Sequence, residues 1–249
     1  MAFRMSPSSD AAAHHRATAA PLKPWGDIAL PALTGITMLT AVVMVFWVVP
    51  NEKIQGVVQR IFYFHVHLAW MCFAGFVLVA GASAWYLRTG STVADRLAEA
   101  SAEVGMLYTT LMLWTGPLWA RPIWGVWWTW DPRLTMTIVL WVIYAAYLML
   151  RRLGDGDETI LRYAAVLGIV GVLDIPLLVL AVRLWRGIHP AVMISDDPEA
   201  GLRDPTMVWA FAISGVALAF LFAWLVSLRV RLATVDQELA VLDAEGEHR

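Results

Sequence analysis

Long apolar runs separated by short polar segments make up most of the chain after about residue 28. A helix needs about 20 apolar residues to cross the hydrocarbon layer, where only helices and closed barrels satisfy their backbone groups. Six runs are long enough to be read as spans, and these cover residues 28–49, 64–86, 102–119, 133–150, 163–182 and 207–228. The pattern therefore predicts an all-α integral membrane protein with six transmembrane helices in residues 25–231.

The segments at the two ends of the chain differ from this membrane domain. Residues 1–24 are rich in Ala, Ser, His, Arg and Pro, which is typical of a disordered tail. Residues 232–249 form an acidic tail. The first apolar run is about 22 residues long, whereas the apolar core of a cleaved signal peptide has about 7–15, so we expect it to remain as a span.

Lys and Arg residues indicate the orientation of the spans. The N-terminal tail, the loops between spans 2–3 and 4–5, and the C-terminal tail hold 11 of them, against 7 in the other three loops. Because the basic excess lies on the cytoplasmic side, both termini are predicted to be cytoplasmic. The loops between spans 1–2, 3–4 and 5–6 then face outward.

Composition agrees with a membrane protein and excludes several functions. The 249 residues are 59% hydrophobic and 15% charged, whereas about a quarter is charged in soluble domains. A net charge of −2 gives no electrostatic case for nucleic-acid binding. Cys72 is the one cysteine, so the chain has no internal disulfide, CxxC pair or CxxCH haem-attachment motif, and Cys72 is expected to pack as a small apolar residue.

Seven of the 14 Trp residues lie between positions 114 and 141, around the outward loop between spans 3 and 4. Pro122 suits the first position of a helix and Pro132 its stop, which predicts a short helix between them. One face of that helix would carry Trp124, Trp127, Trp128 and Asp131. Trp also gathers at membrane interfaces as an anchoring belt. Four Trp within residues 124–130, beside a carboxylate, favour a platform for a flat aromatic ligand.

Three of the six histidines lie beside this loop on the predicted outer face. His65 and His67 begin span 2, and His189 follows span 5. Imidazole is the usual axial ligand of haem iron. Because His65 and His67 are two residues apart, they point to roughly opposite sides of a helix, and at most one is expected to face a shared ligand.

The spans carry no histidine at mid-depth, which disfavours an electron-transfer cytochrome with facing His pairs inside the bilayer. A membrane oxidoreductase subunit that uses haem or quinone is the alternative from another class. A haem channel through the bundle is a third option, and the lack of mid-membrane histidines disfavours a path from ligand to ligand.

The segment Trp124-Gly-Val-Trp-Trp-Thr-Trp-Asp-Pro-Arg-Leu-Thr135 resembles the tryptophan-rich WWD signature of haem-handling proteins in cytochrome c biogenesis. Size, six spans and the loop histidines are similar to the CcmC type, haem exporter protein C. Residues 59–66 are similar to the first histidine motif of that family, and residues 171–189 to the stretch that leads to its second.

The resemblance implies a haem-binding delivery protein, not an enzyme, with its site at the outer face of the inner membrane. Haem b would be a transient cargo, with His65 and His189 as axial ligands of the iron. Its platform would consist of Trp124, Trp127, Trp128, Trp130 and Asp131. The implied partners are the haem chaperone CcmE, the ABC-type subunits CcmA and CcmB, and the small membrane peptide CcmD.

The chain departs from the family pattern at His67, where the family usually has Pro, so His67 is an alternative ligand. Asp174 is a carboxylate inside a span, which suggests function. Its structural interpretation is a hydrogen bond within the bundle, where Pro176 leaves backbone carbonyls unpaired. Basic residues on the outer face can pair with haem propionates or simply flank helix ends; these are Arg60, Arg133, Arg183 and Arg186.

Overall fold

The computed structural model describes residues 24–154, 157–184 and 201–247, and within them the chain is helical without a β-strand. Most of the predicted N-terminal tail lies outside these residues. The long helices, in chain order, are α2 (Pro24–Val43), α3 (Phe62–Thr89), α4 (Thr92–Trp124), α5 (Pro132–Leu153), α6 (Glu158–Gly171), α7 (Asp174–Leu184) and α8 (Pro205–Glu247). A π-helical turn, Met44–Val48, continues α2, and a 3-10 turn, Val57–Ile61, precedes α3.

Five segments in the described part of the chain are long and apolar enough to cross a membrane, by length and composition. They are Ile28–Val48, Val57–Thr89, Pro132–Leu153, Glu158–Leu180 and Pro205–Leu239. The expected third span falls in α4, which is not among them. Its first turns carry Asp95, Glu99 and Glu103, and its later turns hold two prolines, so its apolar content is lower than that of the other spans.

The expected fifth span coincides with the membrane-length segment Glu158–Leu180, but it is interrupted and not one continuous helix. α6 ends at Gly171 and α7 begins at Asp174. Pro176 has no N–H to donate to the carbonyl of residue 172, four positions earlier, so the α-helical ladder is interrupted there. At the break the N–H groups of Leu173 and Ile175 bond instead to carbonyls three residues back, at 3.1 Å each.

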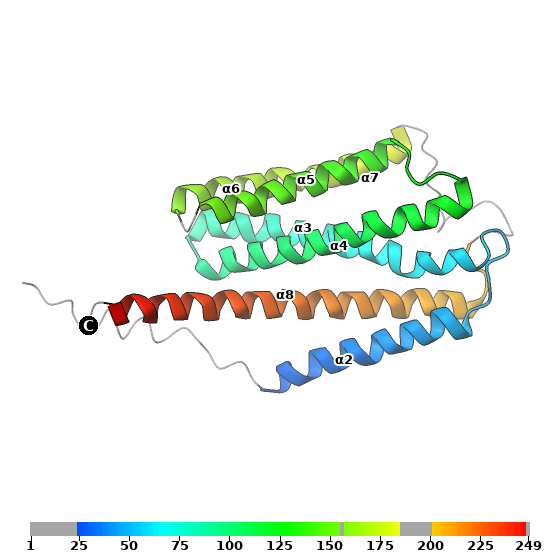
Figure 1. Cartoon of the computed structure of the whole chain (residues 1–249), viewed down its shortest axis with the longest axis horizontal. Helices are drawn as coiled ribbons and strands as arrows, with labels where there is room; N and C mark the ends of the chain where they lie inside the picture. The colour runs from blue at the N-terminus through cyan, green and yellow to red at the C-terminus, as the bar shows by residue number, and fades with distance from the viewer. Residues whose placement is uncertain (1–23, 155–156, 185–200, 248–249) are drawn as a thin grey trace, which may run out of the picture.

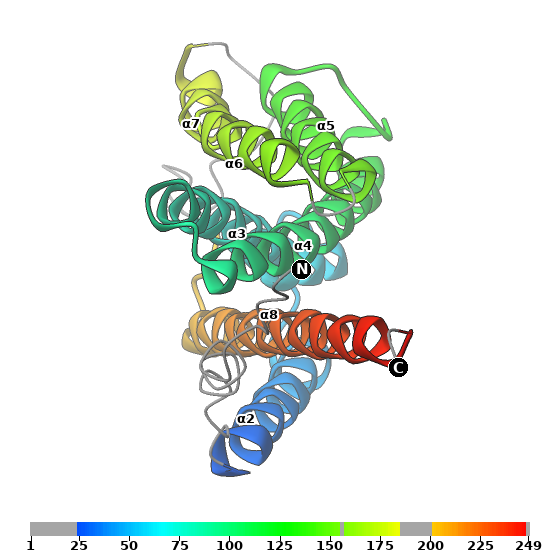
Figure 2. The same ribbon diagram turned by 90° about the vertical axis from the view of Figure 1, so that its left-hand side faces the viewer.

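The helices form layers around a central pair, α3 and α4. Figures 1 and 2 show α5, α6 and α7 on one side of this pair and α8 on the other, with α2 beyond α8. Gly75 and Gly105 face each other where α3 meets α4, and a Cβ on Gly75 would lie 3.2 Å from the Gly105 Cα. The ring of Tyr144 from α5 stacks on Phe76 with centroids 3.5 Å apart.

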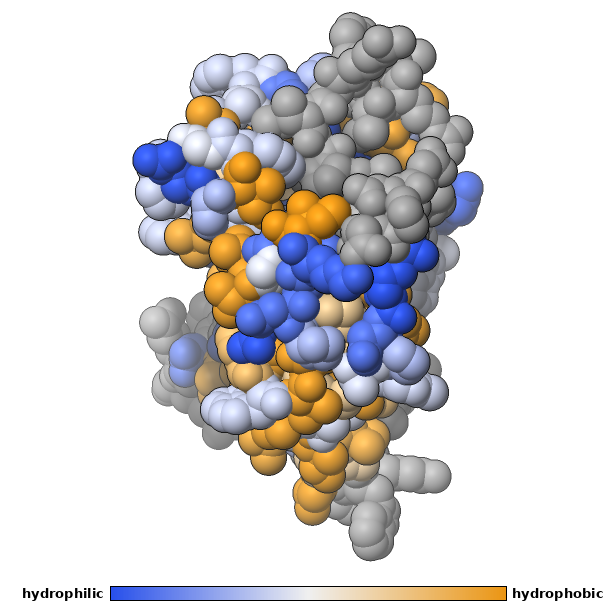
Figure 3. Space-filling view, turned by 90° about the vertical axis from the view of Figure 1, so that its right-hand side faces the viewer, coloured by the Kyte–Doolittle hydropathy of each residue, from blue (hydrophilic) through white to orange (hydrophobic). Residues whose placement is uncertain are grey.

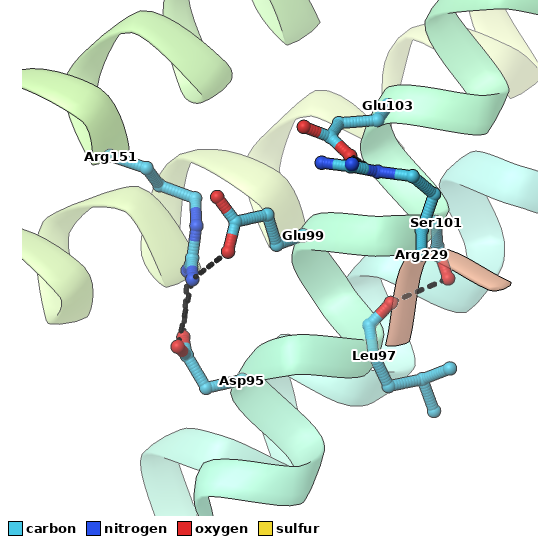
Figure 4. A network of polar contacts seen from close by, with 7 residues as sticks. All are labelled: Asp95, Leu97, Glu99, Ser101, Glu103, Arg151 and Arg229. Atoms are coloured by element: carbon cyan, nitrogen blue, oxygen red, sulfur yellow. Dashed lines mark hydrogen bonds and ion pairs between the residues drawn. The ribbon is translucent and has the colours of Figure 1, made fainter. Parts of the chain in front are cut away.

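Ion pairs join the helices at the end of α4 that is distant from the Trp-rich loop (Figure 4). Arg151 of α5 donates to both carboxylate oxygens of Asp95 at 2.7 Å and to Glu99 at 3.2 Å. Arg229 of α8 pairs with Glu103. These contacts fasten α5 and α8 to the first turns of α4. Cys72 is buried in the core beside Thr109, which agrees with the expected packing role.

Candidate functional site

The Trp-rich segment is a connection between two helices, and the predicted short helix from Pro122 to Pro132 is wrong. α4 continues through Pro122 to Trp124 and ends at Gly125, which has a left-handed backbone (φ 76°). Residues 125–131 are not helical. Asp131 then caps α5, because its Oδ1 accepts the Leu134 N–H at 2.9 Å, and Pro132 occupies the first helical position.

A cavity lies between this connection and helices α3, α4 and α5. It encloses about 1050 Å³ of empty space, part of it open to solvent. Of the residues singled out from the sequence, the cavity brings together His65, Trp124, Trp127, Trp128 and Asp131. All of the predicted platform residues except Trp130 therefore reach one cavity, although through an extended connection and not along a helix face. Figure 3 views this end of the molecule, where hydrophobic and strongly hydrophilic residues lie side by side.

His65 lines this cavity from the second turn of α3. Its Nδ1 lies 2.7 Å from the Thr115 Oγ1 of α4, and its ring meets Trp119 edge to face with centroids 5.7 Å apart. The Thr115 hydroxyl donates its own hydrogen to the Leu111 carbonyl at 2.9 Å. It must therefore accept the hydrogen on the His65 Nδ1, which places the lone pair of the neutral imidazole on Nε2.

His67 faces a different neighbour and does not line the cavity. Its Nδ1 donates to the Tyr63 carbonyl at 2.7 Å, and its ring packs on Phe211 of α8 with centroids 4.2 Å apart. The side chain is only 2% exposed. A Cβ on Gly215 would lie 2.7 Å from the His67 Nε2, so α8 passes directly over the ring. The two histidines therefore diverge, as their spacing predicts.

The four Trp residues of the connection differ in position. Trp124 and Trp128 are half-buried and line the cavity. Trp127 also lines it but is 58% exposed, with the Arg121 guanidinium 5.9 Å from its ring centroid. Trp130 is 76% exposed and lies outside the cavity lining, against Trp128 with centroids 5.8 Å apart.

Several buried polar atoms around the cavity lack a hydrogen-bond partner among the described residues. They are the Trp128 Nε1, the Thr129 Oγ1 and the Asp131 Oδ2. Arg133, the second residue of α5, lines the same space beside Asp131. A buried polar group without a partner costs roughly 1–3 kcal/mol, so water or a bound molecule is expected to supply the missing partners.

Sequence reasoning did not assign the aromatic residues that α3 and α4 contribute. Trp70 and Phe73 line the cavity from α3, and Trp119 lines it from α4. The indole N–H of Trp119 donates to the Gln55 Oε1 at 3.0 Å, which ties the loop before α3 to the cavity wall. Positions 65, 69, 70 and 73 recur at helical spacing, and this signal could have identified the α3 wall.

The other predicted residues divide into three groups. His189 and Arg186 lie outside the described residues, and Arg183 is in the last turn of α7. Arg60 is engaged away from the cavity, because it donates to the Phe46 carbonyl at 3.0 Å and the Asn51 Oδ1 at 3.3 Å. Asp174 is 6% exposed, and its Oδ2 finds no hydrogen-bond partner in the part of the chain that the structure covers.

Comparison with known proteins identifies the family of the chain. The family model described as Heme exporter protein C, CcmC, matches residues 11–245. The Heme exporter protein C of Rhodobacter capsulatus is 31% identical over 91% of this chain and 92% of its own length. That of Bradyrhizobium diazoefficiens is 30% identical over 79% and 75%. A putative cytochrome c biosynthesis ccmC-like mitochondrial protein of Marchantia polymorpha is 32% identical over 63% and 66%. The chain therefore belongs to the Heme exporter protein C (CcmC) family.

Proposed function

We propose that the chain binds haem b in the cavity between α3, α4, α5 and the Trp-rich connection, and delivers it to a haem chaperone. Family membership supports the broader statement that it is an integral membrane transport protein with a role in haem handling for cytochrome c maturation, and not an enzyme. The observation that carries the finer proposal is the meeting of His65 with Trp124, Trp128 and Asp131 at one cavity.

The cavity has the chemistry that haem requires. The indoles of Trp124 and Trp128 offer apolar area for a porphyrin, and the lone pair on the His65 Nε2 suits an iron ligand. Arg133 is the basic residue at the cavity that can pair with a propionate. His189 is the second proposed axial ligand, on the strength of the sequence alone.

Two axial imidazoles would leave no open position on the iron and so hinder its reaction with oxygen. Release then requires one imidazole to leave, which we assign to docking of the chaperone CcmE at the exposed Trp127 and Trp130. The remaining proposed partners are CcmA, CcmB and CcmD. In this scheme the chain has six spans and cytoplasmic termini, and the cavity faces the periplasm from the inner membrane.

The proposal is tested by haem titration of the purified apoprotein in lipid nanodiscs. We expect His65→Ala to change the low-spin, six-coordinate spectrum and weaken binding, whereas His67→Ala, the matched control on the opposite side of α3, should not. Asp131→Asn is more informative than Asp131→Ala, because Asn also caps a helix and only the charge is lost. Native haem affinity and spectrum in both His65→Ala and Asp131→Asn would refute a site in this cavity.

A further inference from the structure

The end of α8 extends past the rest of the bundle. Near this end α8 is held by a hydrogen bond of 2.7 Å from the Arg96 Nη1 to the Thr234 Oγ1, and Asp236 lines the same crevice as Arg96. From there α8 continues to Glu247, which is about three more turns or 16 Å at 1.5 Å per residue. Figure 1 shows this segment reaching beyond the turn between α3 and α4 and beyond the start of α2.

An apolar stripe runs along this extension. Leu232, Val235, Leu239 and Leu242 follow one another at spacings of three, four and three residues, which is the a and d pattern of a coiled coil. Their exposed fractions are 50%, 49%, 53% and 62%. A helix that was merely solvated at this end would not need leucine or valine at every seam position, so the stripe has the form of a docking face.

Acidic residues flank the stripe. With Leu232 and Leu239 at position a, the e and g positions that border the seam are Asp236, Glu238 and Asp243. Residues at e and g set partner choice in coiled coils through their charges. A complementary helix must therefore carry Lys or Arg beside its own apolar seam.

The same charges disfavour the two other occupants of such a face. A parallel α8 from a second copy would place Glu238 opposite the partner copy's Asp243, a like-charge pair. Anionic lipid headgroups also repel an acidic helix. The ion pair between Arg229 and Glu103 marks a polar layer on α8 before the stripe begins.

We propose that the α8 extension, residues 232–243, is a docking site for an amphipathic helix of a partner protein whose apolar seam is flanked by basic residues. This inference does not depend on haem binding, because it concerns the opposite end of the molecule from the cavity. It assigns a function to a charged tail that otherwise has no role in the haem site.

The test uses the full chain in phosphatidylcholine nanodiscs and a fluorescent synthetic helix with Leu at a and d and Lys at e and g. A twin helix with Glu at e and g is the comparison probe. We expect saturable binding of the basic probe only, and at least tenfold weaker binding to the double variant Leu239→Gln and Leu242→Gln. Gln237→Ala, on the opposite side of the helix, should bind as the native chain does.

Charge reversal provides the second arm. Glu238→Lys with Asp243→Lys should transfer the preference from the basic to the acidic probe. Unchanged probe binding in the Leu variants, or an unchanged preference after charge reversal, would overturn the proposal. Self-association of native chains that the Leu variants lose would assign the face to a second copy, and burial of the stripe in phosphatidylglycerol nanodiscs would assign it to the membrane surface; both results also overturn it. Equal unfolding temperatures of all variants check that the bundle is intact.

Discussion

Thr115 is predicted to control haem binding although it does not line the cavity. Its hydroxyl accepts the Nδ1 hydrogen of His65 at 2.7 Å and donates to the Leu111 carbonyl at 2.9 Å. Thr115→Val keeps the volume and removes the acceptor. The His65 ring can then rotate or change tautomer, so that Nε2 no longer presents its lone pair to the cavity.

The size of the effect follows from the loss of one hydrogen bond and of ligand orientation. A neutral hydrogen bond contributes about 1 kcal/mol net, and second-shell partners of metal-bound histidines typically account for a 10–100-fold change in affinity. We expect Thr115→Val to weaken haem binding about tenfold in a titration of the nanodisc-embedded apoprotein. Thr115→Ser keeps the acceptor and should restore most of the affinity, and a shift in the iron–histidine stretching frequency should accompany the Val variant alone.

Thr110 supplies a matched control on the same helix. Its hydroxyl accepts the Trp141 indole N–H at 3.0 Å and donates to the Met106 carbonyl at 2.8 Å, so Thr110→Val removes an equivalent bond away from His65. Haem affinity should stay at the native value in this variant. If Thr115→Val binds haem as tightly as the native chain, or if both variants lose affinity equally, His65 is not oriented by Thr115 and the reasoning fails.

Two further predictions concern stability, read from the thermal unfolding of the nanodisc-embedded chain. Gly215→Ala should lower the free energy of unfolding by about 1–3 kcal/mol, because the new Cβ would lie 2.7 Å from the buried His67 Nε2. An unchanged unfolding temperature would contradict this contact. Asp95→Asn should lower the free energy of unfolding by about 3 kcal/mol, because the buried Arg151 then keeps one of its two hydrogen bonds to residue 95 and loses the opposite charge. Glu99 holds Arg151 by one contact of 3.2 Å, so Glu99→Gln should lower the free energy of unfolding by less than about 1 kcal/mol. Equal losses in the Asp95 and Glu99 variants would count against a bidentate anchor.

The apolar pattern located the helices but not their interruptions. The length of each apolar run predicts the position of most spans, because a segment that crosses lipid must be a long apolar helix whatever its neighbours are. The break before Asp174 depends on one missing N–H at Pro176, and in a hydropathy average this position looks like its surroundings. The prediction of a helix in the Trp-rich connection was wrong for a similar reason. Gly125, Asp131 and Pro132 are strong boundary residues, yet Pro122 and Pro132 suggest the start and the stop of a helix between them.

The candidate site was predictable as a set of residue types and not as an arrangement. The two-residue spacing of His65 and His67 indicated that one of them faces a ligand, but the sequence could not say which. That choice is made by tertiary neighbours, since Thr115 approaches His65 from α4 while Gly215 of α8 leaves room only for the His67 ring. The order of packing between helices is not encoded in any local period, so Thr115 had no visible role before the structure, whereas the helical spacing of Trp70 and Phe73 with His65 was a signal in the sequence.

The two ends of the bundle are held by different kinds of contact, and this difference bears on release of a ligand. At the distant end the ion pairs of Arg151 and Arg229 fix α5 and α8 to α4. At the cavity, α4 and α5 are joined by the connection 125–131, in which three polar atoms lack partners among the described residues. A movement that widens the cavity would separate apolar contacts around Trp124 and Trp128 while the ion pairs remain closed. A partner that docked on Trp127 and Trp130 would act at this end of the bundle.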